Sequence, residues 1–182
     1  TFINLSGLTI SLVCCILLGL YAYAEMTFDG FHQKSAQVFR INKWVTETNK
    51  TPEKHCITSG ALGPELTKEI PEIEHAVRLR PWFNEMVVQH QNTRIKLSDA
   101  VYADADFFKV FDFRLLQGNK NTVLSEPNTA VISLTTAQRF FGNADPLGKT
   151  LIVLNETPVK ISGVLENAPY NSHLKYYLLM SW

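Results

Sequence analysis

Gly148-Lys149-Thr150 is the segment of this 182-residue sequence whose residue types come nearest to a known chemistry, the binding of nucleotide phosphates. A phosphate-binding loop has the pattern G-x-x-x-x-G-K-[ST], and its backbone N–H groups surround the phosphates. Here the first glycine would have to stand at Asn143, and Gly142 is one position too early. Pro146 fixes a backbone angle inside the loop, and a helix is predicted before the segment where the motif needs a strand. We therefore expect a tight turn at 145–148 and no nucleotide site.

Three carboxylates close together in the sequence, Asp99, Asp104 and Asp106, could form an acid–base pair. Local roles explain them more simply, because Asp106 can cap a short helix at 107–111 and Asp104 lies in the turn before it. The sequence contains no G-x-S-x-G and no H-E-x-x-H motif. We therefore predict that the chain is not an enzyme, with no catalytic or cofactor-binding residue, and the sequence does not indicate which residues bind a substrate.

Cysteine and histidine give no metal or disulfide pattern. Cys14 and Cys15 lie in an apolar run and Cys56 stands alone, so the rest of the chain cannot form an internal disulfide. The five histidines have none of the spacings of zinc ligands, and we expect surface or core roles for all of them: His32, His55, His75, His90 and His173.

The N-terminal segment decides where the chain resides. Residues 1–24 carry no charge, and Glu25 ends the run. A helix needs roughly 20 apolar residues to cross the hydrocarbon core of a bilayer, so we predict a transmembrane helix at 1–26. The alternative is a signal peptide cleaved after Ala22-Tyr23-Ala24, although the run exceeds the usual length of a signal core. Lys34 is the first basic residue, which favours an outer location for the following flank.

The composition beyond that segment is typical of a globular domain. The whole chain has 17 basic and 17 acidic residues, a formal net charge of zero, and 46% hydrophobic residues. Because there is no basic block, nucleic acid is not expected as a partner.

Hydrophobic periodicity and turn residues predict an α+β domain whose second half is dominated by strands. Residues 28–37 are expected to continue the membrane helix or to cap it. Ser133 or Thr135 is expected to cap the last helix, and Gly142 suits the left-handed position after it. Strands are predicted at 38–48, 76–80, 86–90, 94–103, 130–133, 151–154 and 159–165, and helices at 64–70, 107–111 and 135–141. The strands at 151–154 and 159–165 are expected to form a hairpin.

Four phenylalanines, Phe107, Phe108, Phe111 and Phe113, lie within seven residues. They form either an exposed patch that grips a hydrophobic partner or a core anchor of the domain. We expect the core role, because positions 107 and 111 share one face of a short helix.

The order of several segments resembles the start of an FtsX-like permease subunit of ABC transporters with a MacB-like periplasmic core domain. The resemblance is carried by the apolar run followed by QVFRINKW, by PEIE leading to AVRLRP, and by YADADFFKVFDFRLLQGN. It continues through EPNTAVISLTTAQRFFGNADPLGKTL and VKISGVLENAPYNSHLKYYLLMSW, so it covers essentially the whole chain and includes the near phosphate loop.

This resemblance implies one transmembrane helix at 1–26 followed by a mixed α/β periplasmic domain of two subdomains. The porter-like part would span 27–105 and a strand-rich part 106–182. The resemblance also implies further membrane helices beyond this sequence, and a location in the bacterial inner membrane. The implied partners are a cytoplasmic ABC ATPase, a second permease subunit in a homo- or heterodimer, the lipid bilayer, and a periplasmic or outer-membrane protein.

The expected function is mechanical. ATP-driven movement of the membrane helices would be converted by the outer domain into export or extraction of a substrate, which requires a rigid connection between helix and domain. An extracytoplasmic sensor is the alternative, and it predicts a pocket with converging polar groups. A secreted enzyme cleaved after Ala24 is a third reading, disfavoured because no catalytic motif is present.

Overall fold

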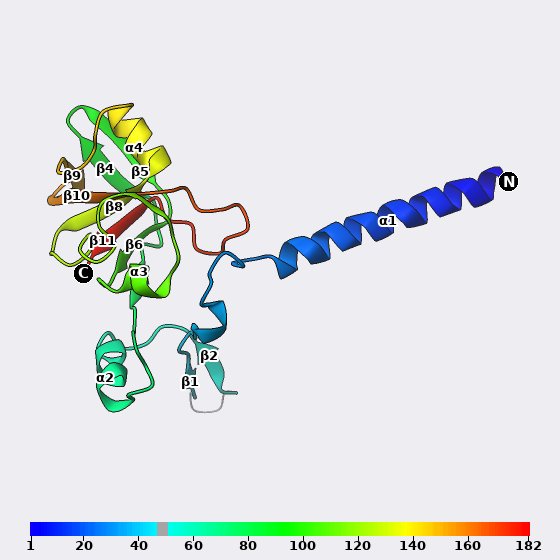
Figure 1. Cartoon of the computed structure of the whole chain (residues 1–182), viewed down its shortest axis with the longest axis horizontal. Helices are drawn as coiled ribbons and strands as arrows, with labels where there is room; N and C mark the ends of the chain where they lie inside the picture. The colour runs from blue at the N-terminus through cyan, green and yellow to red at the C-terminus, as the bar shows by residue number, and fades with distance from the viewer. Residues whose placement is uncertain (47–50) are drawn as a thin grey trace.

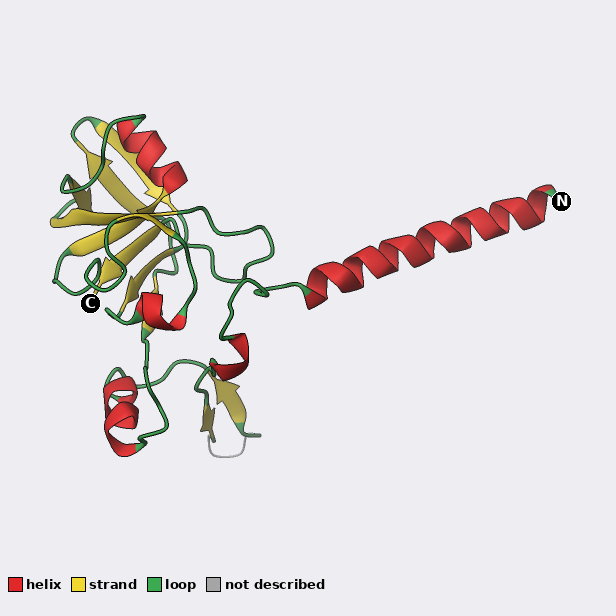
Figure 2. Cartoon of the chain, in the orientation of Figure 1, coloured by secondary structure: helices red, strands yellow, loops and turns green. Residues whose placement is uncertain are grey.

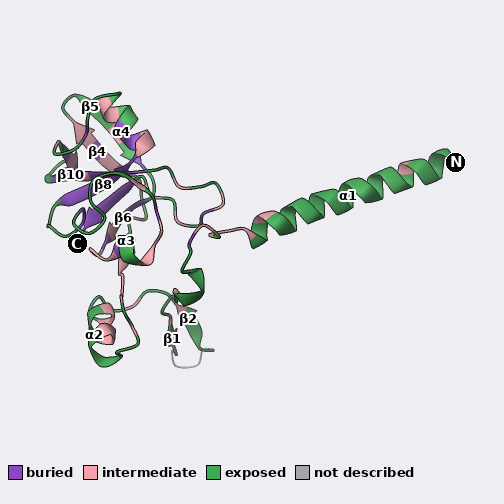
Figure 3. Cartoon of the chain, viewed as in Figure 1, coloured by how far each residue is buried: buried purple, intermediate pink, exposed green. Residues whose placement is uncertain are grey.

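The computed structural model describes residues 1–46 and 51–182. A long N-terminal helix, α1 (Phe2–Met26), projects from a sheet-rich domain, and a smaller unit of one helix and two short strands lies beside the sheet (Figures 1 and 2). The sheet and the segments that pack on it hold the core, whereas no residue of α1 is buried (Figure 3).

Helix α1 is long and apolar enough to cross a membrane. Its polar side chains bond to its own backbone: Ser6 Oγ donates to the Ile3 carbonyl at 2.9 Å, and Thr9 Oγ1 donates to the Leu5 carbonyl at 2.8 Å. Such bonds satisfy hydroxyl groups where no water is present. The helix ends at Met26, so the prediction that residues 28–37 continue it is wrong.

Nine strands among the described residues share one sheet, in the order β3-β6-β11-β8-β10-β9-β4-β5, with β7 paired to β10. The pairs β10–β8 and β11–β6 are parallel, and the others are antiparallel. The strands are β3 (Leu79–Pro81), β4 (Met86–His90), β5 (Thr93–Leu97), β6 (Ala100–Ala103), β7 (Leu115–Gln117), β8 (Thr129–Ser133), β9 (Thr150–Val153), β10 (Thr157–Leu165) and β11 (Leu178–Ser181).

The central strands are apolar on both faces of the sheet and therefore build two cores. In β8, Ala130 and Ile132 belong to a core covered by α4 (Leu134–Phe141). Val131 points to the opposite core, which is covered by α3 (Phe107–Val110). In β11, Leu178 and Met180 belong to the core under α4, whereas Leu179 belongs to the core under α3. This second core is the one that the segment after α1 reaches, through Phe31.

The predicted N-terminal cap of α4 is confirmed, because Ser133 Oγ accepts a hydrogen bond from the Thr136 N–H at 3.2 Å. Gly142 ends the helix with φ of 60° and ψ of −118°, so its φ is positive as predicted but its conformation is not the left-handed helical one. The predicted strand at 86–90 is β4, and the predicted hairpin at 151–165 is formed by β9 and β10.

Other predicted elements differ from the structure. The predicted strand at 94–103 is broken into β5 and β6, because Asp99 adopts φ of 54° between them. The strand predicted at 76–80 begins only at Leu79. Asp106 does not cap α3 with its side chain. Its carboxylate instead accepts charge-assisted bonds from other residues, described below.

The smaller unit contains β1 (Lys43–Val45), β2 (Glu53–His55) and α2 (Leu62–Glu69). The strand predicted at 38–48 is therefore shorter, and its residues 47–48 lie outside the described residues. Helix α2 begins two residues before Pro64. Because the nine-stranded sheet uses strands from both sides of residue 105, a division there does not separate two sheets. The two-part organisation stays a prediction.

Candidate functional site

The connection between α1 and the outer domain is held by hydrogen bonds and aromatic contacts to segments far away in the sequence. We call residues 27–33, together with the segments 111–113 and 171–173 that they contact, the joint. In Figure 1 the chain leaves α1, passes beside the loop between β10 and β11, and then runs towards β1 of the smaller unit. The joint is a packed connection, as the mechanical hypothesis requires, although it is not a continued helix.

Asp29 is the polar centre of the joint. Its Oδ2 lies 2.7 Å from His173 Nδ1, and its Oδ1 accepts from the His173 N–H at 3.0 Å and from Ser172 Oγ at 3.1 Å. Its own N–H donates to the Asn171 carbonyl at 2.9 Å, and Asn171 Nδ2 donates to the Thr27 carbonyl at 2.7 Å. Asp29 has φ of 53°, a conformation that aspartate tolerates better than most residues. Five hydrogen-bonding contacts thus join the exit of α1 to one loop.

Beside this polar cluster, two aromatic side chains enter the second core. Phe31 packs edge-on against Phe113 with ring centroids 5.5 Å apart, and His32 lies 5.3 Å from the same ring. His32 is 8% exposed, and its Nδ1 accepts from the Asp112 N–H at 3.1 Å. Asp112 Oδ2 accepts in turn from the Gln33 N–H at 2.8 Å. The His32 ring cannot rotate freely, because both packing and a backbone hydrogen bond hold it. The orientation of residues 31–33 on the domain is therefore fixed as well as their position.

The phenylalanine cluster supplies the domain side of this contact. Phe107, Phe108 and Phe113 are buried and Phe111 is half-buried, which confirms the predicted core role. The rings of Phe107 and Phe111 lie 5.1 Å apart, as expected for positions four apart on a helix. Tyr176 completes the cluster, and burial raises the pKa of its hydroxyl, with the charges of Asp29 and Asp99 adding to the effect.

The charge of Asp29 is stabilised by its partners. Burial alone would raise the pKa of this carboxyl, but the hydrogen bonds from His173 and Ser172 outweigh it and hold the pKa below its usual value. A carboxyl with a depressed folded-state pKa stabilises the fold above its unfolded pKa, and that contribution is lost as the pH falls through the folded pKa.

We predict that Asp29→Asn lowers the melting temperature of the chain at about pH 5, and that the difference from the parent shrinks towards about pH 3, below the ordinary pKa of aspartate. Asparagine keeps the size of the side chain and tolerates the same backbone conformation. Thermal unfolding in detergent at a series of pH values would measure the difference. A difference that stays constant down to about pH 3 would show that the carboxylate charge does not stabilise the joint.

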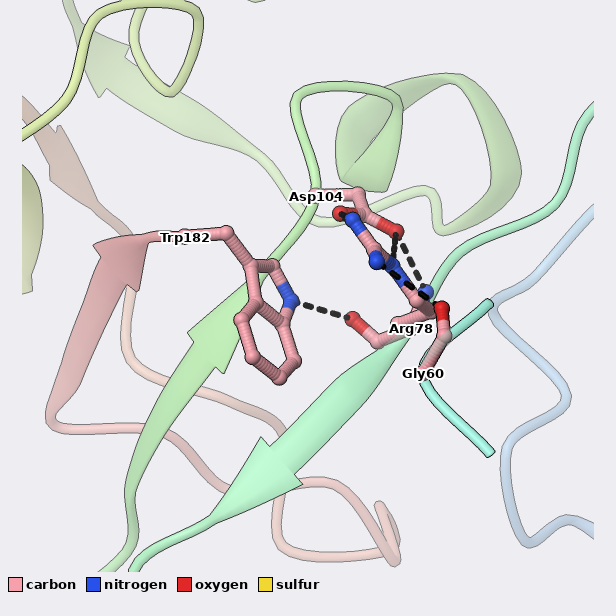
Figure 4. A network of polar contacts seen from close by, with 4 residues as sticks. All are labelled: Gly60, Arg78, Asp104 and Trp182. Atoms are coloured by element: carbon pink, nitrogen blue, oxygen red, sulfur yellow. Dashed lines mark hydrogen bonds and ion pairs between the residues drawn. The ribbon is translucent and has the colours of Figure 1, made fainter. Parts of the chain in front are cut away.

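A second junction links the smaller unit to the sheet (Figure 4). Arg78 Nε and Nη2 donate to the Asp104 carboxylate at 2.9 and 2.7 Å, which raises the pKa of Arg78. Arg78 Nη1 donates to the Gly60 carbonyl at 2.9 Å, and its guanidinium lies 5.0 Å from the Trp182 ring centroid. One side chain therefore connects the turn before α2, the end of β6 and the end of β11.

The other chemically suggestive residues have structural roles. Asp106 contacts Lys109 Nζ at 2.8 Å and His75 Nδ1 at 3.0 Å, and the hydrogen bond from Lys109 is the main cause of its lowered pKa. Asp99 occupies the turn between β5 and β6. His90 Nδ1 lies 2.9 Å from the Thr150 carbonyl oxygen. Within residues 1–46 and 51–182, no three His, Cys, Asp or Glu side chains gather as metal ligands.

The near phosphate loop has the predicted setting, after a helix and before a strand. The Gly148 N–H donates to the Ile161 carbonyl at 2.8 Å, and the Lys149 N–H donates to the Pro146 carbonyl at 3.2 Å. Lys149 Nζ lies 4.8 Å from the Phe141 ring centroid. The backbone N–H groups of Gly148 and Lys149 are thus used within the turn and sheet.

The hydrogen-bond partners within the joint could not be predicted from the sequence. Asp29 and His173 are separated by 144 residues, and neither belongs to a motif that signals an ion pair. The only signal was indirect: the stretch 25–37 contains no proline, which was compatible with a packed connection. Arg78 and Asp104 were likewise not paired in advance.

Comparison with known proteins agrees with the resemblance seen in the sequence. The family model of the MacB-like periplasmic core domain matches residues 1–182. A domain of a candidate permease protein from Porphyromonas gingivalis is 28% identical, with a TM-score of 0.57, and the match covers 68% of this chain and 57% of that one. The chain thus spans little more than half of that structure.

Two further solved structures match less closely. The periplasmic region of MacB from Actinobacillus actinomycetemcomitans is 20% identical with a TM-score of 0.49, covering 65% of this chain and 52% of that one. The extracellular domain of the ABC-type transporter YknZ from Gram-positive bacteria is 20% identical with a TM-score of 0.44, covering 58% and 53%. No curated protein matches the chain. The match of the family model over all 182 residues shows that this chain belongs to the family with a MacB-like periplasmic core domain.

Proposed function

We propose that the chain is part of a permease subunit of an ABC transporter in the bacterial inner membrane, and that the joint transmits movement of α1 to the periplasmic domain. ATP would be hydrolysed by a cytoplasmic partner, and this chain would contribute no enzymatic step. Two permease subunits, identical or different, would work together, with a periplasmic or outer-membrane protein as a further partner. The movement would export a substrate or extract it from the membrane.

The observation that carries this proposal is the bonding of Asp29 and its neighbours to residues 171–173. A flexible linker would absorb a displacement of the helix, whereas a short connection with fixed hydrogen bonds passes it on. The aromatic contact of Phe31 and His32 with Phe113 adds a second point of attachment, two to three residues after Asp29. Two attachment points define a direction, so rotation as well as translation of α1 would reach the sheet.

The sensor alternative predicts a pocket with converging polar groups, and one pocket beside α2 can be compared with that prediction. A cavity of about 350 Å³ lies between α2 and the sheet, with His75, Arg78, Asp104 and Asp106 in its lining. These polar side chains are paired with one another or with Lys109. A ligand would have to break those pairs, which is unlike a preformed binding site with convergent polar groups.

An insertion of four Gly/Ser residues between Met26 and Thr27 tests the proposal. In the complete transporter with its ATPase, spin labels at position 156 of two permease subunits should change their separation when ATP is added. We expect the insertion to abolish that change, because the docked segment 27–33 would stay on the domain while α1 moves independently.

The same insertion after Asn92, in the turn between β4 and β5, serves as the matched control and should leave the ATP-dependent change intact. An ATP-dependent separation that survives the insertion at Met26 would refute the role of the joint. So would a parent transporter whose domains do not move when ATP is added.

A further inference from the structure

We propose that the loop between β10 and β11 rests on the outer leaflet of the bilayer, with Tyr170 as its lipid-contacting residue. The inference depends on the proposed function only in requiring that α1 spans the membrane. It adds a second contact between the chain and the bilayer, made by the outer domain itself.

The height of the loop follows from where the apolar run ends. Residues 1–24 carry no charge, and Glu25 is the first charged side chain, so the hydrocarbon core ends near this end of α1. Tyr21 and Tyr23 are 66% and 68% exposed near the end of the helix, and tyrosine is enriched where hydrocarbon meets headgroups. The end of α1 and the residues just after it therefore stand in the headgroup layer.

Hydrogen bonds hold the loop at that level. Asn171 bonds to the carbonyl of Thr27 and to the N–H of Asp29, the first residues after the helix. Thr27 follows Tyr23 by four residues, which is about 6 Å along the helix axis. Figure 1 shows this loop reaching from the sheet towards the end of α1. The domain thus brings a loop to the membrane surface and fastens it there.

Tyr170 occupies the corner of a tight turn in this loop. The Ser172 N–H donates to the Pro169 carbonyl at 3.2 Å, so Tyr170 and Asn171 are the two central residues of the turn. Asn171 faces the joint through its bonds, whereas the Tyr170 side chain is 79% exposed. Pro169 has a fixed φ, which limits the freedom of the turn.

The chemistry of the exposed side chain suits a lipid interface. A tyrosine ring is apolar along its faces and carries a hydroxyl at its tip, so it can lie among the upper acyl chains while the hydroxyl bonds to headgroups or water. A large exposed ring held on a rigid turn beside a membrane helix loses little conformational entropy on insertion. Lipid is therefore the occupant that the position of Tyr170 favours.

Fluorescence quenching by spin-labelled lipid tests the inference. In a chain whose Cys14, Cys15 and Cys56 are serine, an environment-sensitive NBD label is placed by Tyr170→Cys. The chain is then reconstituted into phosphatidylcholine vesicles containing a headgroup nitroxide lipid. We expect the label at position 170 to lose emission relative to vesicles without nitroxide, and its emission maximum to shift to the blue.

Labels at two further positions serve as negative and positive controls. Glu156→Cys lies in the exposed turn before β10, at the opposite end of that strand from the loop, and should show no quenching. Leu12→Cys lies within α1 and should be quenched by a nitroxide on the acyl chain. Quenching at position 12 without quenching at 170 would overturn the lipid contact while leaving the membrane helix intact. Quenching at neither position would overturn both.

Discussion

Replacing Phe107 by alanine is expected to lower the free energy of unfolding by about 3–5 kcal/mol, the usual cost of deleting a buried aromatic ring. Phe107 is 0% exposed, and its ring lies within 6 Å of four other aromatic rings. These rings are Phe108, Phe111, Phe113 and Tyr176. The cavity would open in the middle of the second core, where neighbours held by the sheet on one side and by the joint on the other have little room to collapse.

Such a loss would be visible as a fall of roughly 6–20 °C in melting temperature, since 1 kcal/mol corresponds to about 2–4 °C in a chain of this size. Circular dichroism of the detergent-solubilised chain would measure it. Phe39→Ala is the matched control, because Phe39 is 81% exposed and its removal should leave the melting temperature unchanged. If both variants melt like the parent, the aromatic cluster does not stabilise the domain and the proposed domain side of the joint is wrong.

Placing arginine at Leu12 is expected to disfavour insertion of α1 by about 2.5–3.5 kcal/mol. Leu12 lies near the middle of the helix, and its side chain is 59% exposed, as expected for a lipid-facing position. An arginine there has no acidic partner within the run of residues 1–24, so its charge would have to be solvated inside the hydrocarbon.

Extraction of isolated membranes at high pH would measure the fraction of chain that stays integrated. We expect that fraction to fall for Leu12→Arg and to be unchanged for the control Leu12→Ile. Recovery of a mature parent chain that begins at Glu25 would contradict the transmembrane prediction, because it would show that residues 1–24 are a cleaved signal peptide.

Local signals in the sequence predicted those elements whose ends are fixed by local interactions. Ser133 and Gly142 delimit α4 because a side-chain cap and a glycine with positive φ act within one turn of helix. The strand at 86–90 and the hairpin of β9 and β10 were found because alternation and turns are also local.

Elements that depend on distant partners were not predicted. The strand β11 lies in the middle of the sheet, yet the sequence LLMS carries no alternation, because both faces of β11 are buried. The joint is a similar case. The helix was expected to continue or be capped after residue 27. Asp29 instead adopts a positive φ, which no local propensity favours over a helix. The hydrogen bonds between Asp29 and residues 171–173 stabilise this conformation.

The separation of 144 residues between Asp29 and His173 also sets an order of events during biosynthesis. At about 5–20 residues per second, the ribosome adds His173 roughly 7–29 s after Asp29. All residues of α1 are synthesised before that interval begins, while the loop that locks it to the domain does not yet exist. In the proposed arrangement the outer domain therefore begins to fold on a loose tether, and its orientation relative to α1 is fixed only near the end of this stretch of synthesis.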